Sequence, residues 1–134
     1  MEHRHVLARS ENYEVSHEFE VVFLARFTSP NPDVVIGDFY GDPATAIIDE
    51  NERFVIMAGC GIIIYKLAES FEPYQYDLQN SQWTELFREP KNHRWIESII
   101  QTDQNTFHFT VDPNSNEAGT YELIFPNLAI QKVR

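Results

Sequence analysis

An alternation of apolar and polar residues over positions 13–27 constrains the fold of this chain more than any other feature of its sequence. The odd positions are mostly apolar, and they are Tyr13, Val15, His17, Phe19, Val21, Phe23, Ala25 and Phe27. Because successive side chains of a strand point to opposite faces, this period predicts a strand with one buried face and one solvated face. We expect one long strand over 13–27, covered on both faces in its second half because Val22 and Leu24 are apolar too.

Short apolar segments separated by Pro, Gly, Asn and Asp continue this pattern through the rest of the chain. Extended segments are expected at 34–36, 44–49, 53–58, 62–67, 94–102, 106–112, 119–125 and 128–133. Segment 53–58 is apolar at odd and even positions alike, which is typical of a central strand covered on both faces. These segments predict an all-β fold, either an antiparallel β-sandwich or a partly open barrel, with α+β as the alternative.

One short helix is expected near residues 80–88. Asn80 or Ser81 can cap its first turn, and a proline follows its last turn. The bases between Arg88 and Arg94 would complement the negative C-terminal end of such a helix. We expect the helix to cover an end or a face of the β structure.

An internal similarity relates residues 47–67 to residues 99–123. Both segments begin with two isoleucines, continue through a turn with Asp and Asn to a Phe, and then carry Gly, Tyr and Leu at unequal gaps. The similarity reflects either a duplicated unit of a hairpin and a strand, or the turn and strand residues that any two hairpins share.

Length and charge limit the classes of protein that this chain can belong to. Its 134 residues match the size of one domain, so we expect a single domain over 1–134 with residues 1–10 as a flexible N-terminal tail. The 21 acidic residues outnumber the ten basic residues and give a net charge of −11, which repels a phosphate backbone, so nucleic acid is not expected as a partner. No apolar run approaches the roughly 20 residues that cross a bilayer, so we expect a cytoplasmic protein without membrane contact.

No cofactor or metal is expected from the residue patterns. Cys60 is the only cysteine, which excludes an internal disulfide and a zinc site built from cysteines. His3 and His5 have a spacing that suits a metal ion, but they lie near a terminus, where chains are usually frayed. Segment 112–123 begins with the ligand spacing of a calcium loop, yet it lacks the glycine at the sixth position and the glutamate at the twelfth.

Two segments carry acids without a single Lys or Arg, namely 28–52 and 67–87. Aromatic residues lie among these acids, in the glycine loop 37–43 and after Pro73. Aromatic rings provide binding area at low entropic cost, while carboxylates steer and orient a cationic partner. We expect the two segments to converge into one binding surface formed by Asp38, Phe39, Tyr40, Asp42, Tyr74, Tyr76 and Asp77.

The function that this pattern favours is that of a small acidic binding or inhibitory protein that masks a basic surface on a protein partner. An immunity protein for a cationic toxin is one example, because grooves that bind nucleic acid are positive. One alternative is a β domain that binds a small molecule. Another is a hydrolase that uses Asp38 and Asp42 as acid and base, or Cys60 as nucleophile. A binding protein is favoured over an enzyme, because aspartates beside glycine usually form turns and a cysteine between glycines suits a tight bend.

Overall fold

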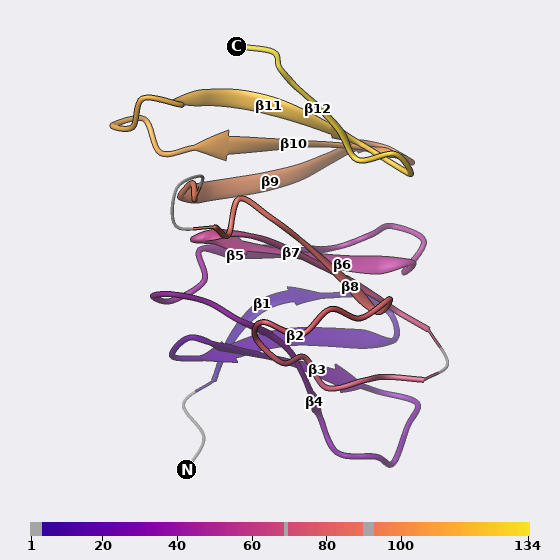
Figure 1. Ribbon diagram of the computed structural model, residues 1–134. Helices are drawn as coiled ribbons and strands as arrows, with labels where there is room; N and C mark the ends of the chain where they lie inside the picture. Colours follow the sequence, from indigo (N-terminus) through magenta and orange to yellow (C-terminus); the bar gives the residue numbers. More distant parts are fainter. Residues whose placement is uncertain (1–3, 69, 90–92) are drawn as a thin grey trace.

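The computed structural model describes residues 4–68, 70–89 and 93–134, which form three four-stranded antiparallel sheets (Figure 1). The first sheet contains β1 (His5–Arg9), β2 (Tyr13–Glu18), β3 (Val21–Arg26) and β4 (Val34–Asp38). The second contains β5 (Thr45–Ile48), β6 (Phe54–Gly59), β7 (Gly61–Lys66) and β8 (Trp83–Leu86). The third contains β9 (Ile96–Asp103), β10 (Thr106–Val111), β11 (Gly119–Ile124) and β12 (Ala129–Lys132). The strands of each sheet follow one another in chain order, and the all-β prediction is confirmed.

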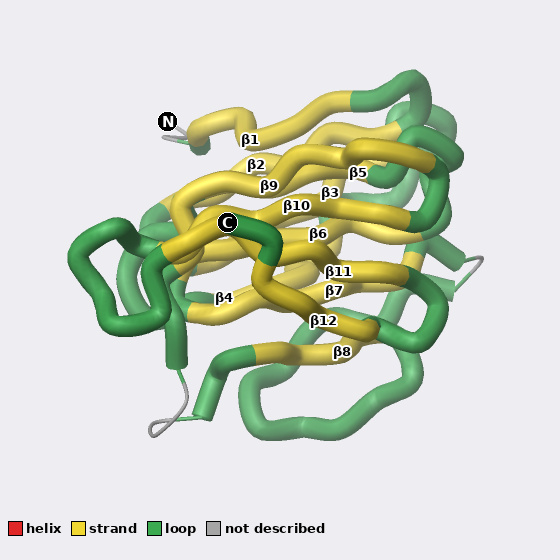
Figure 2. The backbone as a smooth tube through the Cα atoms, turned by 90° about the horizontal axis from the view of Figure 1, so that it is seen from above, coloured by secondary structure: helices red, strands yellow, loops and turns green. Residues whose placement is uncertain are grey.

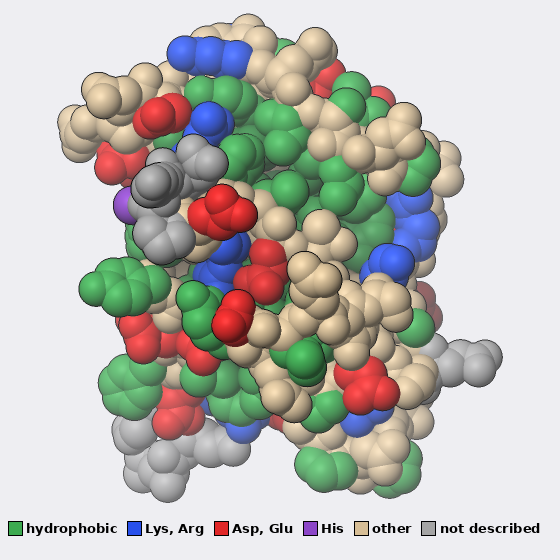
Figure 3. All heavy atoms as spheres, in the orientation of Figure 1, with side chains coloured by type: hydrophobic (Ala, Val, Ile, Leu, Met, Phe, Trp, Pro, Cys, Tyr) green, Lys and Arg blue, Asp and Glu red, His purple; other side chains and the backbone are tan. Residues whose placement is uncertain are grey.

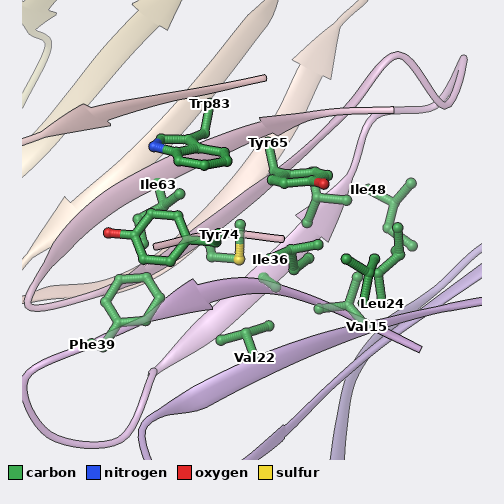
Figure 4. Packing of buried hydrophobic residues seen from close by; sticks show 14 residues of the cluster. Val15, Val22, Leu24, Ile36, Phe39, Ile48, Ile63, Tyr65, Tyr74 and Trp83 are labelled. Atoms are coloured by element: carbon green, nitrogen blue, oxygen red, sulfur yellow. The ribbon is translucent and has the colours of Figure 1, made fainter. Parts of the chain in front are cut away.

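The three sheets form layers, and the second sheet lies between the other two (Figure 1). An apolar core joins the first and second sheets, and residues that form it include Val15, Val22, Leu24, Ile36, Ile63 and Tyr65 (Figure 4). A second core joins the second and third sheets, and residues that form it include Ile56, Ile62, Phe107, Phe109 and Leu123. Every residue of β6 is buried because both of its faces are covered, as the sequence predicts for segment 53–58. The protein is therefore a sandwich of three sheets rather than of two.

The first strands of the three sheets lie beside one another along the same side of the stack. β1 contacts β5, and β5 contacts β9. Figure 2 shows these strands toward one side, with β8 and β12 toward the other. Four-stranded meanders stacked in chain order in this way resemble consecutive blades of a β-propeller. The similar segments 47–67 and 99–123 span equivalent parts of the second and third sheets, from β5 to β7 and from β9 to β11.

Residues 13–27 form a hairpin, so the prediction of one long strand is wrong. Phe19 and Glu20 make a two-residue turn between β2 and β3, and Phe19 has a φ of 52°. Two-residue hairpin turns need such positive φ angles. The turn moves the core-facing apolar positions from an odd number in β2, Val15, to even numbers in β3, where they are Val22 and Leu24. These two apolar residues therefore mark the change of strand and not a second covered face.

Residues 80–88 contain strand β8, so the predicted helix is wrong. β8 pairs with β7, with Trp83 opposite Tyr65. The Asn80 side chain accepts a hydrogen bond from the backbone N–H of Gln82 at 2.7 Å, so it shapes a turn instead of capping a helix. A helix of two turns is unstable alone, whereas the edge of β7 offers a row of backbone partners. In the part of the chain that the structure describes, no helix is long and apolar enough to cross a membrane.

Half of the segment expected as an N-terminal tail belongs to the first sheet, because β1 covers five of its ten residues. β1 pairs with β2, with His5 opposite His17 and Arg9 opposite Glu14. Arg4 forms an ion pair with Asp33 at 2.5 Å. Residues 1–3 lie outside the described residues.

Candidate functional site

A hollow of about 550 Å³ lies where the end of β4, the β6–β7 turn and the residues after β8 meet. The residues that line this hollow are Glu20, Asp38, Phe39, Tyr40, Cys60, Tyr76, Arg88 and His93. They come from all three of the segments named and from the β2–β3 turn and the β7–β8 loop. In Figure 3, acidic and hydrophobic side chains lie close together on the left half of the molecule, around a few basic ones.

Arg88 lies on the buried side of the hollow and joins the segments around it. Its Nη2 donates to the carbonyl of Asp38 at 2.6 Å, and its Nη1 donates to the carbonyl of Cys60 at 3.2 Å. Its Nε donates to Oε1 of Glu85 at 3.0 Å, and its guanidinium lies 4.8 Å from the centre of the Phe39 ring. The Arg88 side chain is only 12% exposed, so its charge-assisted bonds to Glu85 and Cys60 are partly shielded from water, whereas its bond to Asp38 lies at the exposed rim. They hold the wall of the hollow in one arrangement.

Tyr74 supports Arg88 from within the core instead of facing a partner. It is 5% exposed, and its ring lies between Trp83 and Phe39 (Figure 4). Its hydroxyl donates to Oε1 of Glu85 at 2.7 Å and accepts a bond from Arg88 at 3.4 Å. Burial raises the pKa of Tyr74, and the Glu85 carboxylate raises it further, so the hydroxyl keeps its proton as a donor.

The glycine loop after β4 is fastened to the β2–β3 turn. The backbone N–H of Phe39 donates to the carbonyl of Glu20 at 2.9 Å, and that of Gly41 donates to the Glu20 carboxylate at 2.6 Å. Gly41 has a φ of 82°, a backbone conformation that residues other than glycine rarely adopt. Tyr40 is 86% exposed on this fastened loop, and Tyr76, which also lines the hollow, is 71% exposed. The exposed Tyr40 ring is therefore presented on anchored backbone.

The remaining predicted site residues lie close to the hollow without lining it. Asp77 lines a neighbouring groove of about 810 Å³ that shares Tyr76 and Arg88 with the hollow. Asp42 is exposed in the same loop as Tyr40. The structure thus brings the two acidic segments together at Tyr76, through Asp38 on one side and Asp77 on the other.

Asp49, in the acidic segment 28–52, joins sheets away from the hollow. Its buried carboxylate accepts bonds from Nε of Arg53 at 2.6 Å and from the Gln101 side chain in β9 at 2.9 Å. Arg53 also donates to Asn105 in the β9–β10 turn at 2.9 Å. Burial raises the pKa of Asp49, but the bonds from Arg53 and Gln101 outweigh it and hold the pKa below its ordinary value.

Glu52 joins the second sheet to the first in a similar way. Its carboxylate accepts bonds from the Ser10 hydroxyl, from the backbone N–H of Asn12 at 3.0 Å and from the Asn12 side chain at 2.7 Å. These bonds lower the pKa of Glu52. The first turns of the three sheets therefore interlock through Asp49 and Glu52, which act as structural acids.

The other candidates for chemistry from the sequence lie at separate places. Among the described residues, no group of three or more His, Cys, Asp or Glu side chains could hold a metal ion. His5 lies beside His17, with ring centres 5.4 Å apart, and His3 is outside the described residues. In segment 112–123, the Asp112 carboxylate accepts the backbone N–H of Asn114 at 2.9 Å, as turn-forming aspartates do. Only Cys60 belongs to the hollow described above, where it is partly exposed.

Sequence reasoning missed the residues that shape the hollow, above all Arg88 and Glu20. It assigned Arg88 to the end of a helix that does not form. The one signal in the sequence was the glycine at position 61. In the structure Gly61 has a φ of 89°. A Cβ atom at Gly61 would lie 2.6 Å from Cδ of Arg88, so glycine is needed there for the arginine to pass.

Comparison with known proteins adds no relative, because no family model, curated protein or solved structure matches this chain. Its class is that of a three-sheet, all-β protein with an acidic, aromatic-lined hollow at one edge of the stack.

Proposed function

We propose that this protein binds a basic surface of another protein through its hollow and the acids around it, and that it masks that surface. An immunity protein that covers a cationic toxin acts in this way. The observation that carries the proposal is the convergence of Asp38, Tyr40 and Tyr76 on a wall that Arg88 holds together. Exposed aromatic rings are typical binding anchors, and carboxylates beside them attract and orient a cationic partner.

The rigidity of the wall supports a role in binding. Ordering loops and side chains during association costs free energy, and a surface already held in its bound shape avoids much of that cost. Here the Tyr40 loop is bonded to Glu20, and Arg88 is bonded to the carbonyls of Asp38 and Cys60. The exposed Tyr40 ring is therefore mounted on backbone that needs little further ordering.

The test is a charge reversal in which Asp38, Asp42 and Asp77 are replaced by Lys. Each substitution adds two charge units, which moves the net charge from −11 to −5. The wild-type protein should retain a basic protein from an extract of its native cells, and the variant should retain at least about tenfold less because the steering field is lost.

A matched control makes the same charge change on exposed acids elsewhere, at Glu11, Glu97 and Glu117. This control should retain the basic protein within about twofold of the wild type. It changes the net charge of the protein but leaves the carboxylates around the hollow in place. Equal retention by the reversal variant and the control would contradict the proposal, as would the capture of acidic or neutral proteins only.

A second candidate function is the binding of a small molecule. The volume of about 550 Å³ lies within the range of roughly 300–1,000 Å³ that small-molecule sites occupy. This function requires thermal stabilisation by a small molecule and no capture of a protein that depends on Asp38.

A further inference from the structure

We propose that the hollow receives an arginine side chain of the basic partner. Its guanidinium group would lie against the carboxylate of Asp38 and the rings of Tyr40 and Tyr76. This inference rests on the proposed function and names the chemical group that enters the site.

The charge of the hollow favours a cation even though Arg88 lines it. The Arg88 charge is offset within the wall, because its Nε is bonded to the Glu85 carboxylate at 3.0 Å. Asp38 binds Arg88 only through its backbone carbonyl, at 2.6 Å. Among the described residues, no Lys or Arg forms an ion pair with the Asp38 carboxylate. Glu20 adds a second carboxylate to the lining, so an incoming cation meets net negative charge.

The rings of the hollow favour arginine among the cations. A guanidinium group is planar and weakly hydrated and stacks on aromatic faces, whereas a lysine ammonium group is compact and strongly hydrated. The protein holds its own arginines in this manner. Arg88 lies 4.8 Å from the ring centre of Phe39, and Arg94 lies 4.5 Å from that of Phe87. The exposed rings of Tyr40 and Tyr76 offer the same kind of surface to a group from outside.

The proposal is tested by NMR titration of the full chain with N-acetyl-arginine amide. The expected result is saturable binding in the millimolar range, as suits one side chain, with the largest shifts at Asp38, Tyr40 and Tyr76. N-acetyl-lysine amide should bind at least about fivefold more weakly, and the uncharged N-acetyl-citrulline amide should not saturate. Equal binding of the lysine or citrulline compound would overturn the proposal, and so would shifts confined to other surfaces.

Two matched substitutions locate the interaction. Asp38→Asn removes the charge at the rim of the hollow and should weaken binding of the arginine compound at least about tenfold. Glu11→Gln removes an exposed charge in the β1–β2 turn, outside the lining, and should change binding less than about twofold. Equal effects of the two substitutions would show that the net charge of the protein, and not the Asp38 carboxylate, attracts the probe. That result would overturn the proposal.

Failure of this inference is distinguishable from failure of the proposed function. If the charge-reversal variant loses the protein partner while the wild type does not bind the arginine compound, the masking function is supported and the arginine site is rejected. If the arginine compound binds as described while no basic protein is retained, the site stands and masking is rejected.

Discussion

Replacing Arg53 with Met should lower the free energy of unfolding by about 2–4 kcal/mol. Loss of one partner of a fully buried ion pair costs about 3–5 kcal/mol, and the value here is lower because the Arg53 side chain is 37% exposed. Its partner Asp49 has a side chain with no exposure and would keep an uncompensated charge. Arg53 also donates to Asn105, so its loss weakens the contact between the second and third sheets. Denaturant unfolding at neutral pH measures the effect.

A control and a double variant separate this cause from a general loss of charge. Arg9→Met removes an arginine that is 62% exposed and pairs with Glu14, so its cost should stay within about 1 kcal/mol. Combining Arg53→Met with Asp49→Asn should recover part of the loss, since the buried charge disappears. Equal losses from Arg53→Met and Arg9→Met would contradict the role assigned to this pair.

The same pair implies a pH dependence of stability. The pKa of Asp49 is lower in the folded protein than its ordinary value of 3.8. A group of this kind contributes stability that is present above its unfolded pKa and is lost as the pH falls through its folded pKa. The free energy of unfolding should therefore fall below about pH 4, and the fall should be shallower in the Asp49→Asn variant.

Replacing Arg88 with Met should destabilise the protein by about 2–4 kcal/mol and abolish binding at the hollow. The part-buried Glu85 carboxylate and Cys60 carbonyl would lose a donor, and each buried polar group left unpaired costs about 1–3 kcal/mol. The more exposed Asp38 carbonyl would lose its bond as well. The end of β4 and the β6–β7 turn would no longer be joined to the segment that follows β8. Binding is measured by titration with N-acetyl-arginine amide at a temperature where the variant remains folded.

The matched control for Arg88 is Arg94→Met. Arg94 lies over the rings of Phe87 and Tyr121, at 4.5 and 5.3 Å, so its loss should cost about 1 kcal/mol or less. It should leave the arginine titration unchanged within about twofold, since Arg94 does not line the hollow. An Arg88→Met variant that binds the probe as the wild type does would show that Arg88 does not shape the site.

The fold class could be predicted from sequence because alternation and turn residues are local signals. The hairpin at Phe19 could not, since a two-residue turn leaves the apolar spacing almost unbroken and changes only whether odd or even positions are buried. The helix at 80–88 was predicted because Asn80 suits a helix cap and a turn equally. Pairing with β7 favours the turn and strand over the helix. That pairing joins segments separated by a long loop, so it leaves no local signal in the sequence.

The candidate site was partly predictable, because local patterns indicate loops but not contacts between sheets. The glycines at 37 and 41 predict a loop around Tyr40, just after Asp38 ends β4, and loops are usually exposed. The separation of structural acids such as Asp49 from the acids at the hollow depends on contacts between different sheets, which no local pattern reports. The position of Arg88 depends on the path of β8. A helix over 80–88 places Arg88 elsewhere, so the sequence does not predict its role at the hollow.

The most direct measurement of the central claim is the association rate constant of the captured partner as a function of salt. Steering by carboxylates at the hollow predicts that the rate constant falls at least about tenfold as ionic strength rises from roughly 0.02 to 0.5 M. The variant with Lys at positions 38, 42 and 77 should associate slowly at every salt concentration. A wild-type rate constant that does not change with salt, or a variant that associates as fast as the wild type, would contradict the account.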